Sequence, residues 1–169
     1  LKTHRYLGWI SLLLVPLIVI CGVIMMRLMI QGQVNYPPKL VYQLAFIDAC
    51  TLLSFALLYV LALYFRKKLM LHSRFMVATI FGPLLPALAR MFLFTFGIAS
   101  NFNQALTYSY LAIELVLLFI IWKERNKKEI KLTYVPFLVF IVVQHGLMYY
   151  VDDWVWWKVL MDNFANYSS

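Results

Sequence analysis

Four ionisable residues stand inside long apolar stretches of the sequence, and their side-chain chemistry is the most informative feature of the chain. They are Asp48, Arg90, Glu114 and His145. A charged side chain at the centre of a membrane-spanning helix costs about 2.5–3.5 kcal/mol on insertion scales, and it usually faces the bundle interior with a partner. Such a set can form an ion-pair network that fixes helix register, bind the polar part of a small or amphiphilic ligand, or transfer protons or electrons.

The four residues lie at a similar depth in their apolar stretches. Counted from the end opposite the basic loops, each lies about 6–9 residues inside, or roughly 9–13 Å at 1.5 Å rise per residue. Tyr110 shares a helical face with Glu114, and Tyr149 shares one with His145, because residues four apart lie above one another. We therefore expect one polar cluster of these six residues, in the half of a helix bundle that faces away from the basic loops.

The other two histidines, His4 and His72, each precede an apolar stretch at the basic end. Two histidines at matching depth can ligate one b-type haem or a metal ion, or they can be polar helix ends that meet lipid head groups. The sequence has no Cys-x-x-Cys, His-Glu-x-x-His or Gly-x-Ser-x-Gly motif. A metallohydrolase or a nucleophilic hydrolase is therefore disfavoured, and we expect no catalytic residues.

The elements that must position these residues follow from composition. Of 169 residues, 64% are hydrophobic and 13% are charged, whereas soluble domains average about 45–50% apolar and about 25% charged. A soluble enzyme, a disordered chain and a nucleic-acid-binding domain are disfavoured. Five segments approach the about 20 apolar residues that a membrane-spanning helix needs. The expected fold is an all-α bundle of five transmembrane helices, at about 6–26, 42–64, 75–98, 106–122 and 133–151.

The positive charges predict the direction of the chain. Eleven Lys and Arg residues fall at the N-terminus and in the two segments 66–74 and 123–131, against three on the opposite side, at Arg27, Lys39 and Lys158. By the positive-inside rule the N-terminus is cytoplasmic and the C-terminus lies outside. We expect residues 1–151 to form a single transmembrane domain, and 152–169 an amphipathic tail at the outer interface.

Two motifs carry a resemblance. His4-Arg5-Tyr6-Leu7-Gly8 opens the first apolar segment, and His72-Ser73-Arg74-Phe75-Met76 opens the third, which continues to Pro86-Ala87-Leu88-Ala89-Arg90. This pattern resembles uncharacterised small polytopic bacterial membrane proteins with H-R-x-L-G and H-x-R-x-M…P-A-x-x-R motifs, loosely similar to cytochrome b561-like and oxidase-assembly-like proteins. The resemblance implies a role for His4, His72 and Arg90 and, through the two histidines, one b-type haem.

These observations predict a non-catalytic integral protein of the bacterial inner membrane. It would be an accessory subunit or a component that binds a small ligand or lipid, within a homo-oligomer or a larger membrane complex. A membrane redox protein with one b-type haem or a quinone is one alternative, and a proton-coupled transporter is another. We expect no nucleic-acid partner, because the net charge of +8 comes from the basic loops on one side of a membrane.

Overall fold

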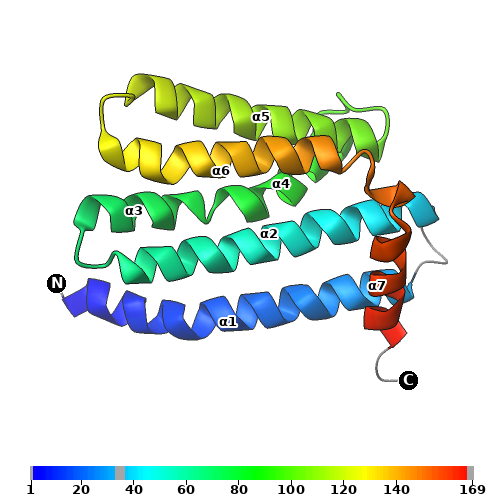
Figure 1. The fold of residues 1–169 in the computed structure, drawn as a ribbon, viewed down its shortest axis with the longest axis horizontal. Helices are drawn as coiled ribbons and strands as arrows, with labels where there is room; N and C mark the ends of the chain where they lie inside the picture. The colour runs from blue at the N-terminus through cyan, green and yellow to red at the C-terminus, as the bar shows by residue number, and fades with distance from the viewer. Residues whose placement is uncertain (1, 33–36, 167–169) are drawn as a thin grey trace. The chain divides into compact units, whose positions relative to one another are not determined.

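The computed structural model describes residues 2–32 and 37–166, and the regular structure in these ranges is entirely helical. Two short elements interrupt the α-helices, a π-helical turn η2 at Met91–Thr95 and a 3-10 turn η3 at Val151–Asp153. The α-helices (Figure 1) are α1 Lys2–Gln31, α2 Pro38–Tyr64, α3 Leu69–Ala78, α4 Phe81–Arg90, α5 Phe102–Lys123, α6 Lys128–Leu147 and α7 Val155–Asn166. The expected all-α fold is confirmed.

Within the described ranges, five helical stretches are long and apolar enough to cross a membrane, and each contains most of one expected span. They are Gly8–Gln31, Lys39–Tyr64, Leu69–Thr95, Phe102–Lys123 and Lys128–Leu147. The third is not one continuous α-helix, because α3 and α4 are separated by a turn at residues 79–80. Pro83 has no backbone N–H to donate to the Thr79 carbonyl four residues earlier, so the helical hydrogen-bond ladder is broken there.

The chain divides into two compact units, and unit 2 comprises Leu53–Leu147. In it, α5 packs against α4 and α6, and α6 packs against α3 (Figure 1). Its core is a set of fully buried side chains at helical spacing on these helices: Leu85, Leu106, Tyr110, Ile113, Leu117, Tyr134 and Ile141. Burial of one face of each helix therefore fixes how α5 and α6 are rotated about their axes.

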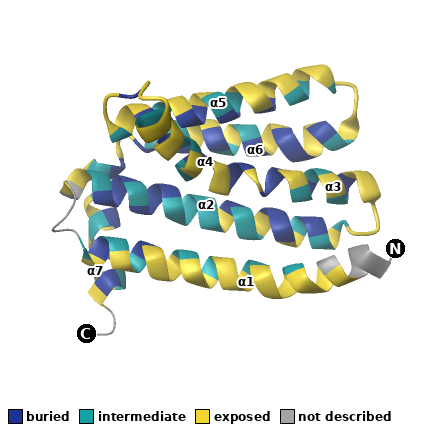
Figure 2. Cartoon of the chain, turned by 180° about the vertical axis from the view of Figure 1, so that it is seen from behind, coloured by how far each residue is buried: buried dark blue, intermediate teal, exposed yellow. Residues whose placement is uncertain are grey.

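Unit 1 comprises Leu1–Leu52 and Met148–Ser169. Here α7 packs against the C-terminal end of α1, where Arg27 Nε and Gln31 Nε2 donate to the Ala165 carbonyl at 3.2 and 2.8 Å. Most of α1 is exposed (Figure 2), and only 6% of its most apolar window is buried. An apolar helix this exposed requires lipid or another hydrophobic surface around it, which agrees with its length and composition.

Candidate functional site

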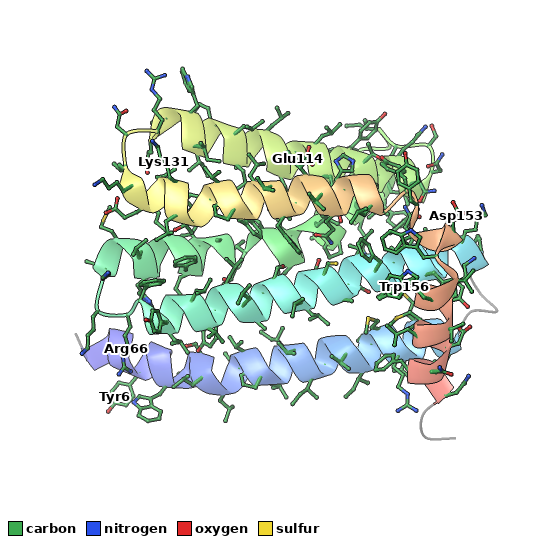
Figure 3. The ribbon with its side chains drawn as sticks, in the orientation of Figure 1. Tyr6, Arg66, Glu114, Lys131, Asp153 and Trp156 are labelled. Atoms are coloured by element: carbon green, nitrogen blue, oxygen red, sulfur yellow. The ribbon has the colours of Figure 1, made fainter. Side chains whose placement is uncertain are left out.

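The polar cluster of unit 2 is built on α5 and α6. The Nδ1 atom of His145 lies 2.9 Å from Oε1 of Glu114, and the two side chains are only 15% and 14% exposed. Figure 3 labels Glu114 on α5, well away from the loop that joins α5 to α6. Two residues separated by 31 positions in sequence thus form a hydrogen-bonded acid–base pair within the apolar part of both helices.

An aromatic ring stacks on one face of the His145 imidazole. The rings of Tyr110 and His145 are stacked, with centroids 4.7 Å apart and planes 6° from parallel. Tyr110 precedes Glu114 by one helical turn on α5 and is fully buried. Glu114 therefore contacts the edge of the imidazole while Tyr110 covers one face, so α5 supplies both groups that orient His145. We call these three residues the α5–α6 cluster.

A capped N-terminus fixes where α5 begins and hence the position of Tyr110 and Glu114 along it. The side-chain oxygen of Asn101 accepts from the backbone N–H of Gln104 at 2.9 Å. The Gln104 side chain in turn accepts from the backbone N–H of Ser100 at 2.9 Å. The first bond satisfies a donor that the first helical turn leaves unused, and the second ties the residue before the N-cap to the same turn.

The Glu114–His145 pair can take part in proton binding and in hydrogen bonding. An ionised carboxylate only accepts hydrogen bonds, so with Glu114 ionised the His145 Nδ1 atom is the donor and the imidazole is either the Nδ1–H tautomer or the imidazolium. In the tautomer, Nε2 is the basic nitrogen. The pair can therefore hold a proton, or hydrogen-bond a polar group of a ligand. In the described residues, no group of three or more His, Cys, Asp or Glu side chains is arranged to hold a metal ion.

Arg90 lies outside the α5–α6 cluster. It is exposed, and its Nη1 atom donates to the Pro86 carbonyl of its own helix at 3.1 Å. Among the described residues no ion pair joins Arg90 to Glu114. Arg90 is exposed because of its position around the helix axis. The buried face of α4 carries Leu85 and Ala89, and the residue after Ala89 points about 100° away from that face.

The remaining candidates are placed as follows. Asp48, on α2, is half-buried and Tyr149 is exposed, and both belong to unit 1. His72, at the start of α3, has its Nδ1 atom 2.8 Å from the Ala62 carbonyl of α2. A carbonyl only accepts, so this nitrogen carries the proton. The His4 backbone lies in α1, but its side chain is outside the described part of the structure.

The sequence analysis missed an ion pair at the basic end of unit 2. Arg74 on α3 donates to Oε2 of Glu124, which follows α5, and Lys127 Nζ lies 3.2 Å from the other carboxylate oxygen. The hydrogen bond from Lys127 and the positive charge of Arg74 hold the pKa of Glu124 below its ordinary value. The sequence did contain a signal for this ion pair, because an acidic residue in a segment rich in Lys and Arg is expected to form an ion pair with one of them.

This pair makes acid stability testable. A carboxyl whose folded-state pKa is lowered contributes stability that is complete above its unfolded pKa and is lost as the pH falls through the folded pKa. We expect Glu124→Gln to lower the Tm at neutral pH, and the difference from wild type to shrink as the pH falls below about 4. Thermal unfolding in one detergent across this range measures it. A difference that does not change with pH, or an equal one in the control Glu129→Gln, would contradict the assignment.

No protein-family model, curated protein or solved structure matches this chain. Its class therefore follows from the fold itself. The regular structure of residues 2–32 and 37–166 is all-helical, and their five long apolar helical stretches are compatible with a multi-pass membrane protein.

Proposed function

We propose that this chain is a multi-pass protein of the bacterial inner membrane, with a cytoplasmic N-terminus and an outer C-terminus. In this proposal it acts as a non-catalytic component of the membrane, a ligand-binding protein or accessory subunit that works in an oligomer or a larger complex. The excess of positive charge at one end supports the direction, because cytoplasmic loops are rich in Lys and Arg. The five apolar helices and their short connections support the multi-pass arrangement.

The observation that carries the binding role is the Glu114–His145 hydrogen bond of 2.9 Å. Ionisable residues inside membrane helices are costly, and those that are present usually serve a site. Tyr110 holds the imidazole plane and Glu114 holds its Nδ1 edge. The pair is thereby preorganised to hydrogen-bond a hydroxyl, amide or carboxyl group of a small or amphiphilic ligand.

Copurification tests this proposal. Wild type, the double variant Glu114→Gln/His145→Gln and the control Glu129→Gln are purified in one mild detergent, and the small molecules extracted from each are compared by mass spectrometry. We expect a compound present in wild type and control, and absent or several-fold reduced in the double variant. Equal profiles in all three proteins, with helical content and size-exclusion profile unchanged, would argue against a ligand at the α5–α6 cluster.

Proton-coupled transport is the second candidate, and the same acid–base pair favours it. Histidine and carboxylate side chains inside membrane helices form the proton relays of pumps and transporters. Proteoliposomes loaded with a pH-sensitive dye and given a membrane potential would measure proton entry. Entry that exceeds that of empty liposomes and is lost in His145→Gln would support a relay, and entry at the empty-liposome rate would count against proton conduction by the pair.

A further inference from the structure

Unit 2 contains an apolar groove whose lining includes no residue of the α5–α6 cluster. Its volume is about 410 Å³, within the range of about 300–1,000 Å³ that ligand sites occupy. The second half of α2, the first half of α6 and one ring of α3 form its walls. The side chains that define it are Leu57, Leu61, Phe65, Phe75, Thr133 and Phe137.

The shape of the groove suits a hydrocarbon chain. On α2 and the residue that follows it, lining residues recur every four positions from Leu53 to Phe65, a distance of roughly 18 Å along a helix. Leu53 and Leu57 are 69% and 57% exposed, so the groove is open to the surroundings along this part of α2. A long, narrow apolar surface with an open side can take a chain that enters laterally from a bilayer.

One end of the groove is strongly cationic. Phe65 is followed directly by Arg66, Lys67 and Lys68, and Lys131 directly precedes the lining residue Leu132. Figure 3 places Arg66 and Lys131 at the same end of unit 2. The segments 66–74 and 123–131 together contain nine Lys and Arg residues and two Glu residues. In the described chain neither Arg66 nor Lys131 makes an ion pair, so both charges are available to an anion.

A buried hydroxyl among the lining residues, that of Thr133, supplies a second, independent indication of a ligand. Thr133 is 2% exposed, and its Oγ1 atom makes no hydrogen bond within the described residues. Hydroxyls in helices ordinarily bond the carbonyl four residues earlier, as Thr107 and Ser109 do at 2.9 and 2.7 Å. Buried hydroxyls are rarely left without a partner. Thr133 lies two residues beyond Lys131, about 3 Å farther along the helix axis, so a ligand with an anionic group at Lys131 would place its next polar atoms near this hydroxyl.

We propose that this groove binds an anionic phospholipid from the leaflet at the basic end. One acyl chain lies between α2 and α6, the Thr133 hydroxyl donates to the ester carbonyl, and the phosphate contacts Arg66 and Lys131. Basic pockets between transmembrane helices on the cytoplasmic side are suited to anionic head groups. The site is separate from the α5–α6 cluster, so it does not depend on the function proposed above.

Lipid titration of the full chain in detergent, read by native mass spectrometry, tests the proposal. The probes are dioleoyl phosphatidylglycerol, dioleoyl phosphatidylcholine and oleic acid. We expect wild type to bind the phosphatidylglycerol about tenfold more tightly than either of the other two. Both phospholipids carry the phosphate, but the choline of phosphatidylcholine places a positive charge beside Arg66 and Lys131, and oleic acid has neither the phosphate nor the ester. Equal affinity for the two phospholipids overturns the charge selection, and oleic acid binding as tightly as phosphatidylglycerol overturns the choice of a phospholipid.

Three variants locate the site. Leu57→Trp fills the groove from an exposed position, and we expect it to weaken phosphatidylglycerol binding about tenfold or more. Arg66→Gln/Lys131→Gln should lower the affinity for phosphatidylglycerol to that for phosphatidylcholine. Thr133→Val removes the hydroxyl and conserves the side-chain volume. It should weaken the binding of both phospholipids several-fold without changing the ratio of their affinities.

Matched controls make each outcome decisive. Leu115→Trp adds the same ring at an exposed position of α5 outside the groove, and Lys123→Gln/Arg125→Gln removes two charges that do not adjoin a lining residue. Both should bind as wild type does. Wild-type binding by Leu57→Trp, or an equal loss in Leu115→Trp, would overturn the groove as the site.

Discussion

Glu114→Leu and His145→Phe are each expected to destabilise the protein by about 2–4 kcal/mol, because each leaves a buried polar group without its partner. The double variant Glu114→Leu/His145→Phe should lose about 1–3 kcal/mol less than the sum of the two, because neither group then remains to be satisfied. The structural basis is the 2.9 Å contact between two side chains that are 15% and 14% exposed. Unfolding of the detergent-solubilised protein, followed by tryptophan fluorescence, measures all three free energies.

A second histidine provides the control for this cycle. His72 belongs to the same unit and bonds the Ala62 carbonyl at 2.8 Å, so it shares no described hydrogen bond with Glu114. Glu114→Leu combined with His72→Phe should therefore be additive within about 0.5 kcal/mol. Additivity between Glu114 and His145 as well would mean that the pair contributes nothing in the folded protein, and the binding site proposed on it would lose its basis.

Trp157→Ala is expected to detach α7 from the rest of unit 1. The indole ring is 7% exposed and packs edge-to-face on Phe46, with centroids 5.8 Å apart, and its Nε1 atom donates to the Tyr42 carbonyl at 3.0 Å. Truncating a buried tryptophan to alanine costs about 3–5 kcal/mol. Hydrogen exchange over Val155–Asn166 should accelerate more than in the other helices, and limited proteolysis should cut within this segment.

The neighbouring tryptophan is the natural comparison. Trp156 is 60% exposed and lies one position earlier on α7. Its ring contacts only those of Trp154 and Trp157 among the ring pairs described, and an aromatic pair contributes about 0.5–1.5 kcal/mol, so Trp156→Ala should accelerate exchange in α7 clearly less than Trp157→Ala does. Equal acceleration in both variants would show that the loss of any indole, and not the Trp157 contacts, controls the docking of α7.

The docking of α7 also depends on Tyr42, which connects α2 to α7 in two ways. Its carbonyl accepts from Trp157, and its hydroxyl donates to Oδ1 of Asp162 at 2.8 Å. Hydrophobic patterning predicted an amphipathic tail over 152–169, and a helix is present at Val155–Asn166. Which residues hold that helix was not predictable, because Tyr42 and Asp162 are separated by 120 positions in sequence.

The sequence by itself determined the helical class and the five apolar stretches. Both depend on residue type and on the 1.5 Å rise per residue, which together require about 20 apolar residues for each crossing. The apolar segments do not give the ends of the helices. The first span was expected over 6–26, and the helix that contains it extends over Lys2–Gln31, because helical hydrogen bonds form within the backbone and do not require apolar side chains.

Only the tertiary structure decided which side chains meet. Depth along a helix is readable from sequence, and it placed Arg90, Glu114 and His145 at one level. The rotation of each helix about its axis cannot be read from the sequence. Burial of the packed faces turned His145 toward Glu114 and left Arg90 exposed. The groove at Thr133 depends in the same way on the packing of α2, α3 and α6. The order of helices around a bundle is set by packing between distant segments, and no local pattern of residues encodes it.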